Sequence, residues 1–373
     1  MSVRRAAAAA GIALLLPTSG GGSSSDSTPL SSAPSFSGGT ATPTSPSASQ
    51  AGSPEHPVVV PAKQGLLGWT RVPGSTRVLV TTNGRWTLQV ADGGTDARLA
   101  GPSGHRTVRA GEHASITDAL LGERYALVVS EDRLARQPDV ATLVDLRSGQ
   151  VTTLDGSSNP PTVVGGTWAL GPDSLVHATS GPRHSYCLAT VQLASGAGTT
   201  GWCARPRHGF SRATITPSAT TMMVFDDHHP SCRSLVEVEG ARLVAIPGIT
   251  RCKGWDSSLD APGAVWSVVP KDRRIEAARF YAHDEAGWFD LGPGTSGSLV
   301  TCAGRSFFTR DPVARTDPAE LLSWDPDAST LTVVYRTRAT GDAFLSPPRC
   351  GGTHLTLTAY SRAGDEQVTT RLG

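Results

Sequence analysis

The chain has 373 residues, with 33 Lys and Arg against 32 Asp and Glu and a formal net charge of +1. A nearly neutral protein has no general attraction for phosphate groups or anionic lipids, so charge-driven binding to nucleic acid or to a membrane surface is not expected. Charged residues make up only 17% of the chain, and the 41 Gly and 27 Pro interrupt helices, so the composition argues against a helical bundle.

The first residues have the pattern of an export signal. Arg4 and Arg5 precede an apolar run from Ala6 to Leu16, which has the length of a secretory signal but is too short to span a bilayer. The stretch that ends this run is similar to a bacterial lipoprotein signal, yet it contains no Cys to which a lipid could be attached. We therefore expect a signal peptide over residues 1–19 and a protein that is secreted or lies on the outside of the cell envelope, with no membrane span beyond the signal.

The following residues have the composition of a spacer. Residues 20–57 are mostly Ser, Thr, Pro, Gly and Ala, and they carry too few apolar side chains to offset the entropy lost on ordering. We predict a disordered linker over residues 20–57 and a single folded domain over residues 58–373.

The cysteines agree with export. All six lie between Cys187 and Cys350, and an even number suits an oxidising compartment. In two pairs of cysteines, one Cys precedes a predicted hairpin turn and the other follows it at about the same distance. Residues that face each other across an antiparallel hairpin are close enough to form a disulfide. A zinc site is not favoured, because no two cysteines form a close CxxC pair. The spacing predicts the disulfides Cys187–Cys203 and Cys232–Cys252, and Cys302–Cys350 follows by elimination.

Short stretches of alternating apolar and polar residues recur along the chain. Each is interrupted by Gly, Asp, Asn or Ser, which is the pattern of a β-hairpin, and the turns repeat at intervals of roughly 35–56 residues. Another apolar stretch precedes most of the hairpins. The predicted hairpins cover residues 86–99, 140–154, 187–203, 235–246, 278–291, 321–335 and 355–372.

A repeat of this length built from four short strands is typical of a propeller blade. The 8 Trp are spread at about one per repeat, as expected if each fills a gap between neighbouring sheets. We predict an all-β fold, a single β-propeller of seven four-stranded blades, with six or eight blades as alternatives. The last repeat is short of a strand, so we expect residues 56–60 or 66–72 to supply it and to close the ring.

Several segments resemble motifs of known propellers. Residues 168–178 resemble the strand–turn–strand unit of TolB-like propellers, and residues 143–149 and 323–327 resemble the strand ends of WD40 repeats. The Gly-His pair that opens WD40 repeats occurs once, at Gly104-His105. The chain thus resembles exported bacterial WD40-like or TolB-like β-propeller proteins of the actinobacterial type. This resemblance implies a fold, and it transfers no functional residues.

Longer and more polar loops are expected between the second and third strands of the middle blades. They cover residues 131–137, 181–186, 226–231, 271–276 and 310–317, and they would lie on one face of the propeller. Loops on a rigid scaffold commonly carry binding sites, although solvated loop tips are the alternative interpretation. The candidate ligand-binding residues on this face are Arg133, Arg136, Arg183, His184, Lys271, Arg273, Arg274, Arg310 and Asp311.

The densest chemical cluster is Asp226-Asp227-His228-His229. Such residues could bind zinc or calcium, or they could act as acid and base. Adjacent residues of an extended segment point in opposite directions, however, so all four cannot easily converge. We therefore expect no cofactor, with a calcium or zinc site at these residues as the alternative. No catalytic residue is assigned, since the chain shows no nucleophile elbow, phosphate loop or His-Glu-x-x-His helix.

Three functions fit these patterns. The favoured hypothesis is a non-catalytic exported propeller, a monomer that serves as a protein- or glycan-binding scaffold at the cell envelope. The alternative is a propeller enzyme, a lyase or hydrolase that acts on a polar extracellular substrate with or without a metal. The third is a structural spacer without a ligand.

Overall fold

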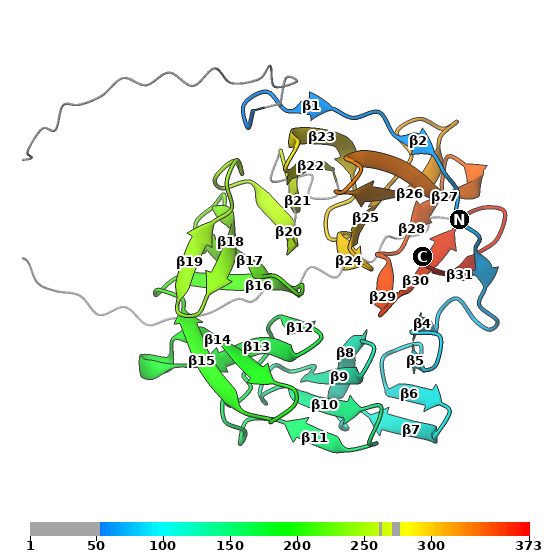
Figure 1. The fold of residues 1–373 in the computed structure, drawn as a ribbon. Helices are drawn as coiled ribbons and strands as arrows, with labels where there is room; N and C mark the ends of the chain where they lie inside the picture. The colour runs from blue at the N-terminus through cyan, green and yellow to red at the C-terminus, as the bar shows by residue number, and fades with distance from the viewer. Residues whose placement is uncertain (1–52, 261–262, 271–276) are drawn as a thin grey trace, which may run out of the picture. The chain divides into compact units, whose positions relative to one another are not determined.

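The computed structural model describes residues 53–260, 263–270 and 277–373. The described residues belong to one compact unit, whose strands form small sheets placed around a common centre (Figure 1). The described residues contain one turn of 3-10 helix, η1 (Pro182–His184), and none of their helices is long and apolar enough to cross a bilayer. The predicted signal peptide and residues 20–52 of the predicted linker lie outside the described residues.

Three sheets contain four antiparallel strands each, in chain order across the sheet. The first consists of β4 (Leu79–Thr82), β5 (Thr87–Val90), β6 (Asp96–Gly101) and β7 (Gly104–Arg109). The second consists of β12 (Trp168–Leu170), β13 (Ser174–Ser180), β14 (Tyr186–Gln192) and β15 (Gly198–Cys203). The third consists of β16 (His208–Ile215), β17 (Thr220–Asp226), β18 (Arg233–Glu239) and β19 (Arg242–Ala245).

Two further sheets have five strands, because a short N-terminal strand is added in parallel to the last strand of each. One consists of β20 (Gly254–Asp260), β21 (Gly263–Val268), β22 (Ala278–Asp284) and β23 (Gly287–Gly294), with β1 (Val58–Val59) at its edge. The other consists of β24 (Val300–Cys302), β25 (Arg305–Arg310), β26 (Pro318–Asp325) and β27 (Thr330–Thr340), with β2 (Lys63–Gln64) at its edge.

The remaining strands form one nine-stranded sheet. Its two antiparallel parts are joined by a single parallel pair, Gly351 with Leu121. One part consists of β8 (Ala114–Leu121), β9 (Tyr125–Asp132), β10 (Val140–Asp145) and β11 (Val151–Leu154). The other consists of β28 (Phe344–Leu345), β29 (Arg349–Gly351), β30 (His354–Tyr360), β31 (Glu366–Arg371) and β3 (Thr70–Arg71).

The predicted all-β propeller is confirmed, but the prediction of seven separate four-stranded blades is wrong. Within the described part of the chain, five blade-sized sheets stand separately, three of these have four strands, and the other strands join in the nine-stranded sheet. The hairpins predicted at 86–99 and 355–372 join the second and third strands of their sheet or sheet part, whereas the other five predicted hairpins join the third and fourth strands. Alternating residues identify a hairpin but do not show which neighbouring edge it will bond to.

The core lies between the faces of neighbouring sheets. In β22, the side chains of Ala278, Phe280 and Ala282 alternate with more exposed ones, so one face of the strand is buried. Phe280 stacks on Phe308 of the next sheet, with 4.0 Å between the ring centroids. Full burial of such a side chain contributes about 1.5–3 kcal/mol. Each sheet therefore depends on its neighbours for the burial of its apolar faces.

The N-terminal segment covers the outer edges of three sheets in succession (Figure 1). After β1 and β2 it reaches β3, which pairs with β31, so the segment 66–72 supplies the strand that was predicted to complete the final blade. Val72 N–H donates to the Gln367 carbonyl at 2.7 Å, and Trp69 Nε1 donates to the Val334 carbonyl at 2.8 Å. Covering these edges removes unpaired backbone groups that could template aggregation.

The predicted disulfide bonds are confirmed, and the described residues contain no free cysteine. Cys187–Cys203 links β14 and β15 of one hairpin, whereas Cys232–Cys252 links the residue before β18 to the connection that precedes β20. Cys302–Cys350 links β24 to β29 and so ties two different sheets together. The three pairs are Cys187–Cys203, Cys232–Cys252 and Cys302–Cys350.

We expect the disulfide between sheets to stabilise the fold more than one within a hairpin. The Cys302–Cys350 pair is separated by 48 residues and the Cys187–Cys203 pair by 16, so the former restricts the unfolded chain by about 1 kcal/mol more. Urea unfolding of the two double alanine variants, C302A/C350A and C187A/C203A, measures this difference. An equal or larger loss for C187A/C203A would contradict it.

Candidate functional site

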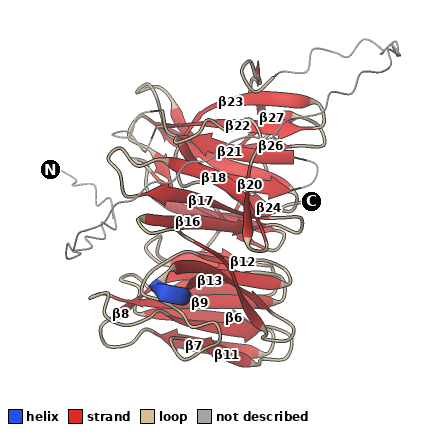
Figure 2. Cartoon of the chain, turned by 90° about the vertical axis from the view of Figure 1, so that its left-hand side faces the viewer, coloured by secondary structure: helices blue, strands red, loops and turns tan. Residues whose placement is uncertain are grey.

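The loops between second and third strands lie at one end of the sheets, because the sheets share the same strand order. In Figure 2 the strands run across the view and the loops gather at its two sides. We use the name long-loop face for the end that carries residues 133–139, 181–185, 227–232 and 311–317, together with the connections that enter the first strands there. Lys271, Arg273 and Arg274, which were predicted on this face, lie outside the described residues.

Arg133 and Arg136 are exposed in the loop that follows β9. The carboxylate of Asp132 organises this loop by accepting the N–H groups of Arg136 and Leu134 at 2.8 and 3.2 Å. These backbone hydrogen bonds lower the pKa of Asp132, the bond from Arg136 most of all. The loop is therefore held in a defined shape while its two guanidinium groups remain accessible to a ligand.

Arg183 and His184 are both exposed in η1. Both residues have a φ of 58°, which is uncommon for residues other than glycine. Ser185 closes this turn, because its Oγ donates to the Pro182 carbonyl at 2.8 Å. The neighbouring disulfide Cys187–Cys203 fixes the strand that leaves the turn.

Arg310 has a different environment from the other predicted arginines. Its Nε donates to the Pro293 carbonyl at 2.9 Å, and a second nitrogen donates to the Leu291 carbonyl at 3.2 Å. Glu320 lies 3.7 Å away, and burial lowers the pKa of the Arg310 guanidinium. Arg310 thus ties β25 to β23 of the neighbouring sheet, and Asp311 follows it at the start of the loop.

The structure separates the members of the 226–229 cluster. Asp227 accepts the Nε of Arg207 at 2.8 Å, whereas Asp226 lies 3.2 Å from Nδ1 of His228. The pKa values of both carboxyl groups are lowered, Asp227 chiefly by Arg207 and Asp226 chiefly by a loop amide. Within residues 53–260, 263–270 and 277–373, no three His, Cys, Asp or Glu side chains are placed to hold a metal ion.

Beneath the long-loop face lies a group of acidic side chains that sequence analysis missed. Burial raises the pKa of Asp118 to about 6, and the negative charges of Glu131 and Asp139 add to the rise. Burial also raises the pKa of Asp139 to about 6, against the hydrogen bonds it accepts from Gly165 N–H and Trp168 Nε1 at 2.9 and 3.3 Å. Asp139 is 1% exposed, so it supports the loops rather than facing a ligand.

The long-loop face also exposes apolar side chains, which the sequence patterns did not indicate. Val313 is 83% exposed, Leu134 56% and Phe344 52%. Phe344 stacks on Tyr360 at 4.6 Å, which gives a second aromatic side chain beside it. Arg and aromatic side chains such as Phe344 are among the residue types enriched at protein interfaces, and Leu134 and Val313 add exposed apolar surface.

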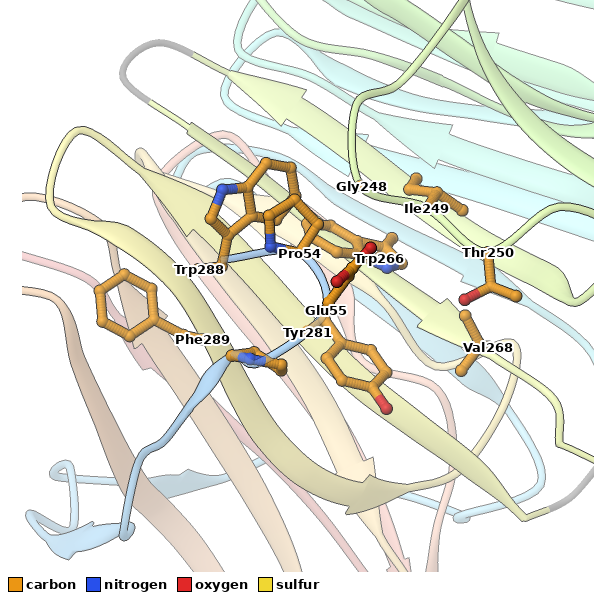
Figure 3. Close-up of a pocket in the computed structure, with 11 residues that line it drawn as sticks. Pro54, Glu55, Gly248, Ile249, Thr250, Trp266, Val268, Tyr281, Trp288 and Phe289 are labelled. Atoms are coloured by element: carbon orange, nitrogen blue, oxygen red, sulfur yellow. The ribbon is translucent and has the colours of Figure 1, made fainter. Parts of the chain in front are cut away.

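A cleft of about 630 Å³ lies beside the outer strand β23 (Figure 3). This volume is within the range of small-molecule sites, about 300–1,000 Å³. Three walls come from the β20–β23 sheet, from the connection that follows β19 and from the segment that precedes β1. The cleft is lined by Pro54, Glu55, Pro57, Gly248, Ile249, Thr250, Trp266, Val268, Tyr281, Trp288 and Phe289.

Strand register explains why the aromatic side chains meet in this cleft. Trp266 faces Tyr281 across β21 and β22, and Trp288 faces His283 across β22 and β23. Because side chains alternate between the two faces of a strand, Tyr281 and His283 share one face of β22. Trp266, Tyr281 and Trp288 therefore lie on the same face of the sheet. Gly248 allows the Trp288 ring to lie against the backbone, since a Cβ there would be 2.0 Å from the ring.

Comparisons with known proteins identify the fold but no family. No protein-family model and no curated protein matches the sequence. Among solved structures, the propeller domain of the trilobed protease from Pyrococcus furiosus has a TM-score of 0.51 at 8% identity, over 85% of this chain and 97% of that chain. The chain is therefore similar to β-propeller proteins in fold, and identities this low say nothing about activity.

Two enzymes are also among the structural neighbours. A prolyl endopeptidase structure matches with a TM-score of 0.50 at 13% identity, over 79% of this chain and 48% of that chain. An oligogalacturonate lyase in complex with manganese matches with a TM-score of 0.48 at 13% identity, over 84% of this chain and 99% of that chain. Identities this low show the fold alone, so the site itself must decide the function.

The raised pKa values predict how stability changes with pH. Asp118 and Asp139 have a pKa near 3.8 when unfolded and about 6 when folded, so the folded state binds more protons between these values. Their contribution to the free energy of unfolding therefore falls as pH rises from 4 to 6. We expect Asp118→Asn, which removes the charge, to stabilise the protein by about 1–2 kcal/mol at pH 7.5 and by much less at pH 4.5.

Thermal unfolding at the two pH values checks this expectation. Asp327→Asn, at an exposed carboxylate in the β26–β27 turn, is the control and should change stability little at either pH. A loss of stability in Asp118→Asn at pH 7.5 would show that the Asp118 carboxylate is a favourable partner in the folded state.

Proposed function

We propose that the protein is a non-catalytic binding scaffold that is exported and acts at the outside of the cell envelope, where it binds a protein or a glycan. The observation that carries this proposal is the long-loop face, where exposed apolar side chains and arginines stand on loops with a defined shape. The three disulfides and the absence, within the described residues, of a membrane-spanning helix are consistent with an extracellular protein.

The chemistry of the face favours a protein over a glycan as its ligand. Leu134 and Val313 offer apolar anchors, and Arg133 and Arg136 lie in the same loop as Leu134. Aromatic and Arg side chains that become buried supply most of the binding energy of protein interfaces, and apolar contacts around them exclude water, whereas rim charges mainly affect the rate of association. A partner with apolar pockets and a few carboxylates would complement this surface.

The rigidity of the loops supports a binding role. Asp132 holds the 133–137 loop through backbone hydrogen bonds, and disulfides fix the strands beside two other loops. A surface that is already ordered loses less conformational entropy when it binds. The face can therefore recognise a partner without first having to fold.

We expect loss of the two apolar anchors to weaken partner binding by at least tenfold. The variant L134S/V313S removes side chains that are exposed in the free protein, so its stability should be unchanged while each lost anchor costs about 1–2 kcal/mol of binding. Biolayer interferometry of the full disulfide-bonded chain against purified surface-exposed envelope proteins and against cell-wall glycan fragments measures the effect. The control is Val151→Ser, at an exposed residue on the outer strand β11.

Two results would argue against the proposal. Equal binding by wild type and L134S/V313S would place the binding surface elsewhere. Release of products from polar oligosaccharides or peptides by the purified chain would indicate a lyase or hydrolase instead.

A further inference from the structure

The aromatic cleft beside β23 is a second surface with its own chemistry. It shares only Gly248, Ile249 and Thr250 with the long-loop face, in the connection that enters β20, and none of its lining residues belongs to the loops 133–139, 181–185, 227–232 and 311–317. Three aromatic rings form its floor, and the proline-containing segment before β1 forms its outer wall (Figure 3). A ligand bound in this cleft would therefore be a function beyond the one proposed for the long-loop face.

The rings form a corner rather than a flat stack. Trp266 and Tyr281 are nearly parallel, with 6.0 Å between centroids and 20° between planes. Trp288 stands at 73° to Trp266, with 5.8 Å between centroids. Tyr281 and Trp288 are half-buried, so a ligand can reach them from the cleft. Two aromatic planes that meet at a steep angle can present negative π-faces to one compact group.

Glu55 is the one charged residue among the 11 residues that line the cleft. Arg279 lies on the same strand as Tyr281, but its Nε donates to the Asp290 carboxylate at 3.0 Å, so its charge is compensated by that pair. Burial raises the pKa of Tyr281, so its phenol remains neutral at physiological pH. The lining therefore combines aromatic faces with one negative charge, which favours a positive ligand and disfavours an anion.

The wall that carries Glu55 has a defined shape. The backbone N–H of His56 donates to the Ser53 carbonyl at 3.0 Å, and the N–H of Ser53 donates to the His56 carbonyl at 3.3 Å, so Pro54 and Glu55 occupy a tight turn. Pro57 leads directly into β1, which pairs with β23 at Phe289. The turn is thereby attached beside the aromatic floor.

We infer that this cleft binds an organic cation, namely an alkylated ammonium group that lies against Tyr281 and Trp288, with the buried Trp266 behind them, and is neutralised by Glu55. Its methyl groups fill apolar space, and its charge is attracted by the π-faces and by the carboxylate. The cavity of about 630 Å³ is larger than the ammonium group alone, so it also accommodates the part of the ligand to which the group is attached.

A pair of matched probes tests this inference. Choline and 3,3-dimethylbutan-1-ol have the same shape, but only choline carries a positive charge. Ligand-observed NMR and tryptophan fluorescence titration on the full disulfide-bonded chain should show choline binding at least about tenfold more tightly than the alcohol. A parallel titration with a trimethyl-lysine peptide distinguishes an ammonium group on a protein from a free small molecule. The inference is supported if choline or the peptide binds more tightly than the uncharged alcohol.

Variants separate the charge from the shape of the site. Glu55→Gln should weaken choline binding about tenfold and leave binding of the alcohol unchanged. Gly248→Ala should weaken both probes, because the new Cβ displaces the Trp288 ring, and a normal melting temperature would show that the fold is intact. Glu285→Gln, at an exposed carboxylate in the β22–β23 turn, is the matched control and should bind choline as wild type does.

Three outcomes would overturn the inference. Equal affinity for choline and the alcohol would reduce the cleft to an apolar pocket, and unchanged choline binding in Glu55→Gln would remove the carboxylate from the site. Binding of cellobiose in place of choline would identify a neutral sugar site instead. The variant L134S/V313S should bind choline normally, so failure of this inference and failure of the proposed function are distinguishable.

Discussion

Every small antiparallel sheet has two apolar faces and two open edges, and the structure depends on how these are covered. A sheet of four short strands is too small to bury its own faces, so each one packs against the next, as Phe280 does against Phe308. A ring of sheets is the arrangement in which every face has a neighbour. The outer edges remain, and residues 58–72 cover three of them in turn.

This arrangement produces both surfaces described above. Because strands alternate in direction, the connections of all sheets collect at two ends, and the longer ones form the long-loop face. The aromatic cleft instead lies where the connection after β19 and the segment before β1 meet one face of the β20–β23 sheet. Trp266 is buried, while Tyr281 and Trp288 remain half-exposed, and the cleft opens beside them. One surface thus arises from the ends of the strands, and the other from the space between the β20–β23 sheet, the connection after β19 and the segment before β1.

Local patterns predicted much of the fold. The Cys187–Cys203 pair followed from its spacing around a turn, because register within a hairpin is set by the turn itself. The parallel pairing of Gly351 with Leu121 joins two strands that are far apart in the chain, and no local sequence pattern could indicate this pairing. The number of separate sheets was therefore predicted wrongly although most of the hairpins were found.

The site was less predictable, because exposure and partners depend on tertiary contacts. Asp226 and Asp227 are adjacent in the chain, yet they take different partners because strand residues alternate. The sequence predicts Arg310 as an accessible ligand-binding residue, whereas in the structure its guanidinium donates to two carbonyl groups of the neighbouring strand β23. The grouping of Trp266, Tyr281 and Trp288 requires the register of three strands. Once that register is known, the alternation of side chains between the two faces of a strand places the three aromatic residues on the same face of the sheet.

Amide hydrogen exchange on the full disulfide-bonded chain tests the central claim most directly, namely that a ring of mutually packed sheets is completed by the N-terminal segment. The account predicts that the amides of Gly65, Leu67 and Val72, which donate to carbonyls of β27 and β31, exchange about as slowly as those of the strands they cover. Exchange of these amides at the rate of a free loop, with β31 still protected, would contradict the closure on which the arrangement of both surfaces rests.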